Sequence, residues 1–395
     1  TVTANGGTSV YGSSPANPGL SASGLQNGED VSVLTGLSNS FGITSTSSVA
    51  GGPYTLNVLG TLTNPNYQVT ALNTGNWTVT PASVVVTANG GTSVYGSSPA
   101  NPGLSASGLQ NGEDVSVLTG LSNSFGITST TGVAGGPYTL NVLGTMTNPN
   151  YQVTSLNTGI WTVTPAPIVV TANGGTSVYG SSPTNPGLSA TGLQNGEGVD
   201  VLTGHSNSFG ITSTTGVAGG PYTLNVAGLL ANPNYQVTSL NTGIWTVTPA
   251  PIVVTANGGT SVYGSSPANP GLSATGLQNG EGVDVLTGLI NSFGITQVSG
   301  VVGSPYHLSV LGMLTNPNYL VTARNVGIWS VTPASITVTA DAQSRLLSES
   351  DPLLTYRITS GQLFNGDQFS GALARDAGSA VGFYAINRGT LAASS

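Results

Sequence analysis

Residues 77–86 of the chain read Trp77-Thr-Val-Thr-Pro-Ala-Ser-Val-Val-Val86. Apolar side chains alternate with polar ones before and after Pro81, which is the pattern of two half-buried β-strands in direct succession. Closely similar stretches begin at Trp161, Trp245 and Trp329, each 84 residues after the one before. We therefore expect a tandem array of one small β domain, with no flexible linker between successive copies.

The repeat is long enough for each copy to fold around a core of its own. A period of 84 residues exceeds the roughly 20–50 residues of a solenoid repeat and suits a small domain. Residues 2–83 and 86–167 differ at only six positions, which indicates recent duplication. We place the domains at residues 1–82, 83–166, 167–250 and 251–334, followed by a diverged and truncated copy at 335–395.

Short strands and turns are expected throughout each copy. Tyr54, Leu56 and Val58 alternate with polar residues, which predicts a strand with one buried face. The segments 67–71 and 77–79 flank Asn73-Thr-Gly75, a short connection typical of a hairpin, so each copy is predicted to end in a hairpin. No amphipathic helix of ten residues is visible, although residues 25–34 leave room for a shorter one.

These patterns predict an all-β fold, built as a tandem array of small antiparallel β domains. About six short strands per copy suit a sandwich-like domain and a β-grasp-like domain equally well, and both stay open. With each domain roughly 30 Å across, the four complete copies would form an elongated rod on the order of 120 Å long.

The charge and composition of the chain exclude several kinds of partner and site. Lysine is absent, only five residues are arginine, and the net charge is −8. Nucleic acids and anionic lipid surfaces are bound through clustered Lys and Arg, so we expect no nucleic-acid partner. No apolar run reaches 18 residues, so we expect no direct membrane insertion. Cysteine is absent, which rules out disulfides and thiolate metal sites.

No catalytic residue, cofactor site or metal site is predicted, and the chain is not expected to be an enzyme. His205 and His307 are the only histidines, and neither recurs at the equivalent position of another copy. A site carried by every copy would need the same chemical group in each of them. We therefore interpret both histidines as incidental substitutions.

Two recurring groups of residues raise the question of a ligand. Each copy has one pair of acidic residues, which offers too few oxygens for Ca²⁺ and has a variable spacing, so we interpret the pair as part of a solvated turn. The aromatic residues suit a glycan-stacking platform, but core packing explains them better. The acidic pairs are Glu29/Asp30, Glu113/Asp114, Glu197/Asp200 and Glu281/Asp284, and the aromatic residues of the first copy are Tyr11, Tyr54, Tyr67 and Trp77.

Several short motifs of the repeat resemble a known family. In the first copy they are Val10-Tyr-Gly12, Asn17-Pro18, Gly24-Leu-Gln-Asn-Gly28, Pro53-Tyr-Thr55, Asn66-Tyr67 and Trp77-Thr-Val-Thr-Pro81. The fifth copy has Asp351-Pro352 and Asn365-Gly-Asp367 but departs at Leu347-Ser348, where Tyr-Gly stands in the other copies. These motifs resemble the MBG repeat domains (YGX type) of filamentous-haemagglutinin-like and other large bacterial surface proteins.

The resemblance implies an exported, adhesin-like protein in which such domains form a repetitive stalk, and it implies neither a ligand nor enzymatic residues. We expect a structural stalk segment of an extracellular, cell-surface adhesin or biofilm-matrix protein, which extends a binding region away from the bacterial cell. Two alternatives stay open. One is a filament subunit that assembles with neighbouring chains through strand complementation, and the other is a module that binds host or matrix glycans weakly and multivalently.

Overall fold

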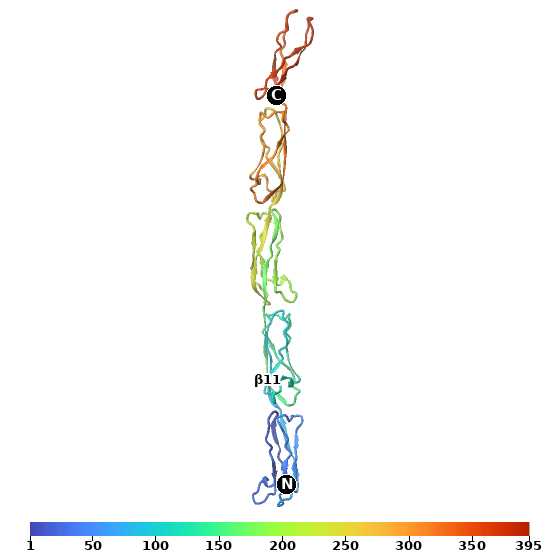
Figure 1. The fold of residues 1–395 in the computed structure, drawn as a ribbon, viewed down its shortest axis with the longest axis vertical. Coiled ribbons are helices and arrows are strands. Elements are labelled where there is room, and N and C mark those ends of the chain that lie inside the picture. Colours follow the sequence, from blue (N-terminus) through green and yellow to red (C-terminus); the bar gives the residue numbers. More distant parts are fainter. Residues whose placement is uncertain (395) are drawn as a thin grey trace. The chain divides into compact units, whose positions relative to one another are not determined.

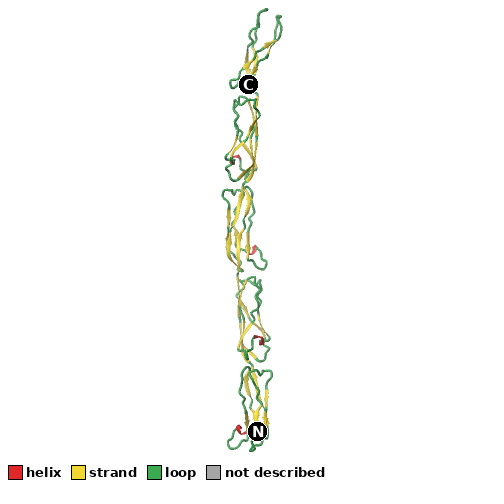
Figure 2. Cartoon of the chain, viewed as in Figure 1, coloured by secondary structure: helices red, strands yellow, loops and turns green. Residues whose placement is uncertain are grey.

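The structure, a computed structural model, describes residues 1–394 and is built of short strands joined by turns (Figures 1 and 2). The all-β prediction and the tandem order of small sheets are confirmed. No helix among the described residues is long and apolar enough to cross a membrane. By their contacts the residues divide into two compact units: Thr1–Thr171, Leu188–Ser206 and Ala227–Asn241 form the first, and Ala172–Gly187, Asn207–Val226 and Thr242–Ser395 form the second.

Repeat 2, which lies within the first unit, shows how the strands of one copy are arranged. Its first strand, β9 (Ala82–Ala88), is the centre of a three-stranded sheet. On one side β11 (Leu104–Ser107) runs antiparallel to β9, and on the other β15 (Tyr151–Asn157) runs parallel to it. The first strand of the copy is therefore paired with a strand near its end.

The last strand of repeat 2 is the centre of a second sheet. This strand is β16 (Gly159–Thr164), which is parallel to β10 (Gly91–Val94) and antiparallel to β13 (Tyr138–Leu140). A small antiparallel pair is formed by β12 (Leu121–Asn123) and β14 (Val142–Gly144), and η2 (Val115–Val117) is a single 3₁₀ turn.

The other complete repeats have the corresponding elements. Repeat 1 has β1 (Val2–Ala4), β2 (Gly7–Val10), β3 (Leu20–Ala22), η1 (Val31–Val33), β4 (Leu37–Asn39), β5 (Tyr54–Leu56), β6 (Val58–Gly60), β7 (Leu72–Asn73) and β8 (Gly75–Thr80). Repeat 3 has β17 (Ala166–Ala172), β18 (Gly175–Val178), β19 (Leu188–Thr191), η3 (Val199–Val201), β20 (His205–Asn207), β21 (Tyr222–Leu224), β22 (Val226–Gly228), β23 (Tyr235–Asn241) and β24 (Gly243–Thr248). Repeat 4 has β25 (Ala250–Ala256), β26 (Gly259–Val262), β27 (Leu272–Thr275), η4 (Val283–Val285), β28 (Leu289–Asn291), β29 (Tyr306–Leu308), β30 (Val310–Gly312), β31 (Tyr319–Asn325) and β32 (Gly327–Thr332).

The fifth copy contains only two-stranded sheets among the described residues. They pair β33 with β34, β35 with β38, and β36 with β37, all antiparallel. The bounds are β33 (Thr337–Ala340), β34 (Tyr356–Ser360), β35 (Phe369–Ser370), β36 (Ala374–Arg375), β37 (Ile386–Asn387) and β38 (Ala392–Ala393).

A tryptophan on the last strand organises the core of each complete repeat. In repeat 2, Trp161 is buried, packs edge-to-face against Phe125 with ring centroids 5.0 Å apart, and donates from Nε1 to Ser93 Oγ at 2.9 Å. Gly91 pairs with Trp161 across the sheet, and a Cβ at Gly91 would lie 2.6 Å from the indole ring. The glycine is therefore needed for the tryptophan strand to approach.

The predicted terminal hairpin is wrong. In repeat 2 the two strands concerned, β15 and β16, belong to different sheets, and each takes a parallel partner from the start of the repeat. The domains are consequently mixed rather than purely antiparallel. The predicted strand over Tyr54, Leu56 and Val58 is divided at Asn57 between β5 and β6, although the expected alternation of buried and exposed side chains is present. The short helix within residues 25–34 is η1.

Candidate interface between repeats

Successive complete repeats contact each other through side chains that recur at the same positions of each repeat. Between repeats 1 and 2 they lie within the first unit, and the chain crosses from β8 to β9 through the single residue Pro81. Apolar side chains on both sides of this crossing form one buried cluster, which includes Tyr11 and Trp77 of repeat 1 and Val84 and Tyr151 of repeat 2. The hydrophobic core is thus continuous from repeat 1 to repeat 2.

A carboxylate held by two tyrosines lies at this junction. Tyr11 follows β2 and donates from its hydroxyl to Glu113 Oε1 at 2.7 Å. Tyr151, at the start of β15, donates to Glu113 Oε2, and its own hydroxyl oxygen accepts from the backbone N–H of Gln110 at 2.9 Å. The two rings meet edge-to-face with centroids 5.5 Å apart. Glu113 therefore links an aromatic residue of repeat 1 to one of repeat 2.

Two asparagines add backbone hydrogen bonds to the same junction. Asn111, whose φ is +54°, donates from Nδ2 to the carbonyl oxygen of Ser45 at 3.0 Å. Asn150 accepts at Oδ1 from the N–H of Val49 at 2.9 Å. Because both asparagines belong to repeat 2 and both partners to repeat 1, these bonds fix the orientation of the two copies at their junction.

The same contacts recur at the next two junctions. Tyr95 donates to Glu197 at 2.6 Å, and Tyr179 donates to Glu281 at 2.6 Å. The second carboxylate oxygen accepts from Tyr235 and Tyr319, respectively. The asparagine bonds recur as Asn195 to Ser129, Asn234 to Val133, Asn279 to Ser213 and Asn318 to Val217. We call each Tyr–Glu–Tyr set a junction clamp.

The junction between repeats 4 and 5 has a different composition. Tyr263 packs edge-to-face against Phe364, with ring centroids 6.2 Å apart. Phe364 stands at the position that Gln110, Gln194 and Gln278 occupy at the earlier junctions. Asn365 Nδ2 donates to the carbonyl oxygen of Gln297 at 2.8 Å, so the asparagine bond is kept. Asp367 stands at the position of the clamp glutamate.

The surroundings of the clamp glutamates differ from the solvated turn that was predicted for the acidic pairs. Glu113, Glu197 and Glu281 are half-buried at junctions, whereas a solvated turn was expected. That interpretation suits Asp114, which caps η2 by accepting from the N–H of Ser116 at 2.8 Å. No group of three or more His, Asp or Glu placed to hold a metal occurs within residues 1–394.

The aromatic and histidine residues lie as follows. Tyr11 and Trp77 are buried and Tyr54 is half-buried, with its hydroxyl donating to the carbonyl of Ser48 at 2.7 Å. These rings belong to the core, so the glycan hypothesis gains no support from them. His205 on β20 has Nδ1 3.4 Å from the carbonyl oxygen of Ala227, and His307 is exposed on β29.

The tyrosines of the clamp are expected to make the stability of the chain depend on pH in the alkaline range. Burial, with the hydrogen bond to the neighbouring glutamate, raises the pKa of Tyr151, Tyr235 and Tyr319 from 10 to about 12. A tyrosine whose pKa is higher in the folded state than in the unfolded state stabilises the fold. This contribution is fully present below the unfolded-state pKa and is lost as the pH rises through the folded-state pKa. We therefore expect the free energy of unfolding to fall between about pH 10 and 12.

Urea unfolding at fixed pH values, with tyrosine ionisation followed by ultraviolet absorbance, measures this effect. The matched control is a chain with Tyr151, Tyr235 and Tyr319 all replaced by phenylalanine, which should show a flatter dependence across the same window. A wild-type chain whose unfolding free energy does not change between pH 10 and 12 would contradict the assignment.

Comparison with protein families and solved structures gives the following matches. The model of the MBG domain (YGX type) matches residues 1–78, 84–162, 168–246 and 336–395. No curated protein matches the chain. Among solved structures, the I9–I11 tandem of titin is 8% identical, with 64% of this chain and 98% of that one covered and a TM-score of 0.20. The N-terminal eight Ig domains of Down syndrome cell adhesion molecule are 11% identical (95% and 62% covered, TM-score 0.17), and Drosophila N-cadherin EC1–4 is 10% identical (71% and 82% covered, TM-score 0.20).

Proposed function

Because the chain belongs to the MBG domain (YGX type) family, we propose that it is a non-enzymatic stalk segment of a large exported bacterial surface adhesin or biofilm-matrix protein. Its role is to carry a binding region away from the cell. A stalk must keep successive domains from folding back on one another, so its stiffness would depend on the contacts at the junctions between domains.

The recurring junction clamp is the observation that supports this proposal. At three junctions a glutamate accepts from one tyrosine of each neighbouring repeat, next to two asparagine bonds to the backbone of the preceding repeat. Hydrogen bonds to a charged acceptor are stronger than neutral ones, and a partly buried carboxylate that lost them would be left poorly solvated. Bending at a junction therefore costs several bonds at once.

Small-angle X-ray scattering of the whole chain across a concentration series tests the proposal. We expect a monomer whose four complete repeats form a stiff rod on the order of 120 Å long. A compact particle, or a broad distribution of shapes, would contradict a stalk. Growth in length with concentration would favour the filament alternative instead.

A further inference from the structure

The Tyr-Gly pair of each complete repeat lies in a tight turn at the junction with the next repeat. In repeat 1 this turn runs from Val10 to Ser13 and is closed by a hydrogen bond from the N–H of Ser13 to the carbonyl oxygen of Val10, at 3.0 Å. Tyr11 belongs to the junction clamp. Gly12, the third residue of the turn, has a φ of +88° and makes a separate contact with repeat 2.

Gly12 leaves room for a side chain of the following repeat. A Cβ at Gly12 would lie 2.4 Å from both Cβ and Cγ of Gln110. The Cβ of Gln110 is fixed to its backbone, so it could move away only together with the segment that carries it. Any residue larger than glycine at position 12 would therefore displace part of repeat 2.

Gln110 is the first residue of a turn that we call the docking turn, Gln110-Asn-Gly-Glu113. The N–H of Glu113 donates to the carbonyl oxygen of Gln110 at 2.9 Å, and Asn111 and Gly112 both have a positive φ, as in a type I′ turn. This conformation is the one that an Asn-Gly sequence favours. The sequence of repeat 2 therefore fixes the shape of the docking turn locally.

Three side chains of the docking turn meet one small surface of repeat 1. Gln110 packs on Gly12, and Glu113 accepts from Tyr11 at 2.7 Å. Asn111 donates to the carbonyl oxygen of Ser45, which also accepts from the N–H of Gly12 at 3.0 Å. The Tyr-Gly pair and this carbonyl therefore contact the docking turn as one unit.

The glycine contact occurs at all four junctions, including the one between repeats 4 and 5, which has no clamp. At each of the other three junctions a Cβ on the glycine would lie 2.3–2.5 Å from a side-chain atom of the next repeat. The pairs are Gly96 with Gln194, Gly180 with Gln278 and Gly264 with Phe364. The first residue of the docking turn can thus be glutamine or phenylalanine, whereas the residue on which it packs is always glycine.

The fifth repeat has the docking turn but not the Tyr-Gly pair. Leu347 and Ser348 stand in its place. The turn around them is kept, because the N–H of Glu349 donates to the carbonyl oxygen of Leu346 at 3.2 Å and Ser348 has a φ of +77°. The conformation of this turn therefore does not by itself require glycine, which leaves the contact with the next repeat as the reason for Gly12.

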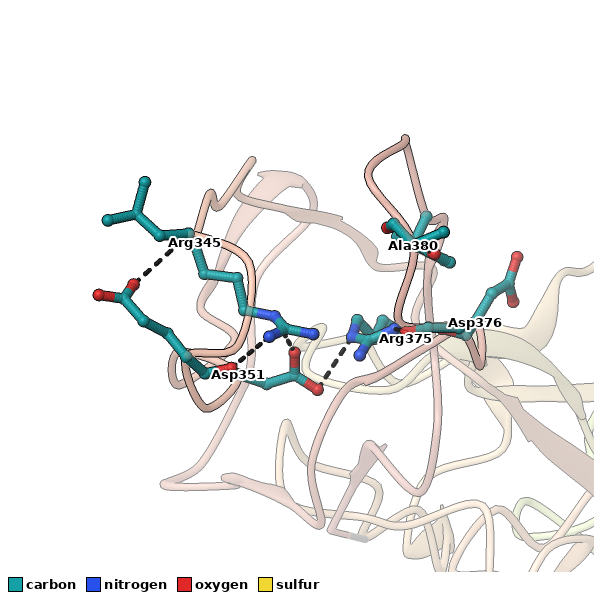
Figure 3. Close-up of polar contacts among 9 residues, drawn as sticks. Arg345, Asp351, Arg375, Asp376 and Ala380 are labelled. Atoms are coloured by element: carbon teal, nitrogen blue, oxygen red, sulfur yellow. Dashed lines mark hydrogen bonds and ion pairs between the residues drawn. The ribbon is translucent and has the colours of Figure 1, made fainter.

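Charged residues hold the corresponding loop of the fifth repeat. Asp351 accepts from Arg345 Nε at 2.8 Å and from Arg375 Nε at 2.9 Å, and Figure 3 shows its carboxylate between the two guanidinium groups. No arginine precedes Arg324 in the chain, so the equivalent loops of repeats 1–4 have no such contacts. The Leu347-Ser348 loop is therefore fixed within its own repeat.

We propose that the Tyr-Gly pair determines which domain can follow a repeat in a stiff arrangement. The partner that it accepts is a repeat whose docking turn reads X-Asn-Gly-acid, where X packs on the glycine and the asparagine donates to the neighbouring carbonyl. The glycine is the specificity-determining residue, because a Cβ at its position rejects the turn. A Leu-Ser pair rejects it as well. The proposal rests on the stalk function and extends it from stiffness to the choice of neighbour.

Hydrogen exchange at one junction of the whole chain tests the proposal. The N–H of Val49 donates to Asn150 Oδ1 across the junction of repeats 1 and 2, so its exchange reports how often that junction opens. In the variant Gly12→Ala, we expect the Val49 amide to exchange at least tenfold faster, as measured by mass spectrometry of peptides. Val133 and Val217, the equivalent amides at the next two junctions, should exchange as in the wild type.

Two further variants separate the contact from backbone strain. Gly19→Ala is the matched control, because Gly19 has a φ of +69° in the same repeat and no other atom lies within 4 Å of a Cβ there. It carries similar strain and should leave the Val49 exchange unchanged. When Gln110→Gly is added to Gly12→Ala, the exchange should return to within threefold of that of Gln110→Gly alone.

The outcomes decide as follows. Equal acceleration by Gly12→Ala and Gly19→Ala would overturn the proposal. So would a failure of Gln110→Gly to restore the exchange, including the case in which Gly12→Ala unfolds repeat 1. The double variant Tyr11→Leu, Gly12→Ser gives repeat 1 the pair of the fifth repeat, and unchanged Val49 exchange in it would also contradict the proposal.

The exchange measurement and the scattering measurement test different statements. Exchange of Val49 reports a single junction, whereas scattering reports the shape of the whole chain. A chain that is compact in scattering but responds to Gly12→Ala as expected would contradict the stalk function and support the role of the Tyr-Gly pair. A stiff rod whose Val49 amide does not respond would support the stalk and overturn that role.

Discussion

Replacement of Trp161 by alanine is expected to unfold repeat 2 at far lower urea than the other repeats. The indole is only 5% exposed, packs against Phe125 and bonds to Ser93, so its removal leaves a large cavity and an unpaired hydroxyl. Loss of a buried aromatic side chain costs about 3–5 kcal/mol. That is a large part of the roughly 5–15 kcal/mol that stabilises a small domain.

Limited proteolysis across a urea series, with the cleavage sites identified by mass spectrometry, measures the stability of repeat 2 separately from its neighbours. Ile160→Ala is the matched control, because Ile160 precedes Trp161 on the same strand and is 51% exposed. We expect that control to change the free energy of unfolding by less than about 0.5 kcal/mol. Equal losses in the two variants would mean that the tryptophan does not organise the core.

Removal of all three clamp glutamates is expected to make the chain flexible at its junctions. In the variant Glu113→Ala, Glu197→Ala, Glu281→Ala, each junction keeps two tyrosine hydroxyls without their carboxylate acceptor. An unsatisfied buried polar group costs about 1–3 kcal/mol. We expect the free energy that holds the two repeats together at each junction to fall by about this amount. We expect a smaller radius of gyration and a broader distance distribution in X-ray scattering, and faster proteolysis near Pro81.

The matched control replaces the other acidic residue of each pair. Asp114, Asp200 and Asp284 lie close to the clamp glutamates in sequence but are exposed. Their replacement by alanine removes the same charge while the tyrosines keep their acceptors. Scattering curves that change equally in both triple variants would attribute the effect to net charge, and the clamp would then not be what stiffens the junctions.

The local features of the fold could be predicted from the sequence, because alternation and turn residues act over a few positions. The pattern of Tyr54, Leu56 and Val58 gave the buried face correctly. The partners of each strand could not be predicted in this way. Gly91 and Trp161, for example, pair although they are 70 residues apart in sequence. The short Asn-Thr-Gly connection suggests a local hairpin, but the strands on its two sides form parallel pairs with strands from the start of the repeat instead.

The junction clamp was missed because a single acidic residue in a polar turn looks the same whether it is solvated or buried. One signal was nevertheless present. The glutamate occupies the same position of every complete repeat, at Glu29, Glu113, Glu197 and Glu281. The accompanying aspartate directly follows the glutamate in repeats 1 and 2 but lies three residues after it in repeats 3 and 4. A polar group that holds its register while its neighbour drifts is under a geometric constraint.

The parallel pairing of early and late strands also decides how a repeat responds to force. The first two strands of repeat 2 are β9 and β10, and the last two are β15 and β16. Tension on the chain therefore pulls the first two strands toward the N-terminal side and the last two toward the C-terminal side. In a parallel pair such opposed pulls act along the strands, so the β10–β16 and β9–β15 ladders are loaded in shear. Their hydrogen bonds must then break together rather than one after another. We therefore expect each repeat to resist extension when the chain is pulled at its two ends.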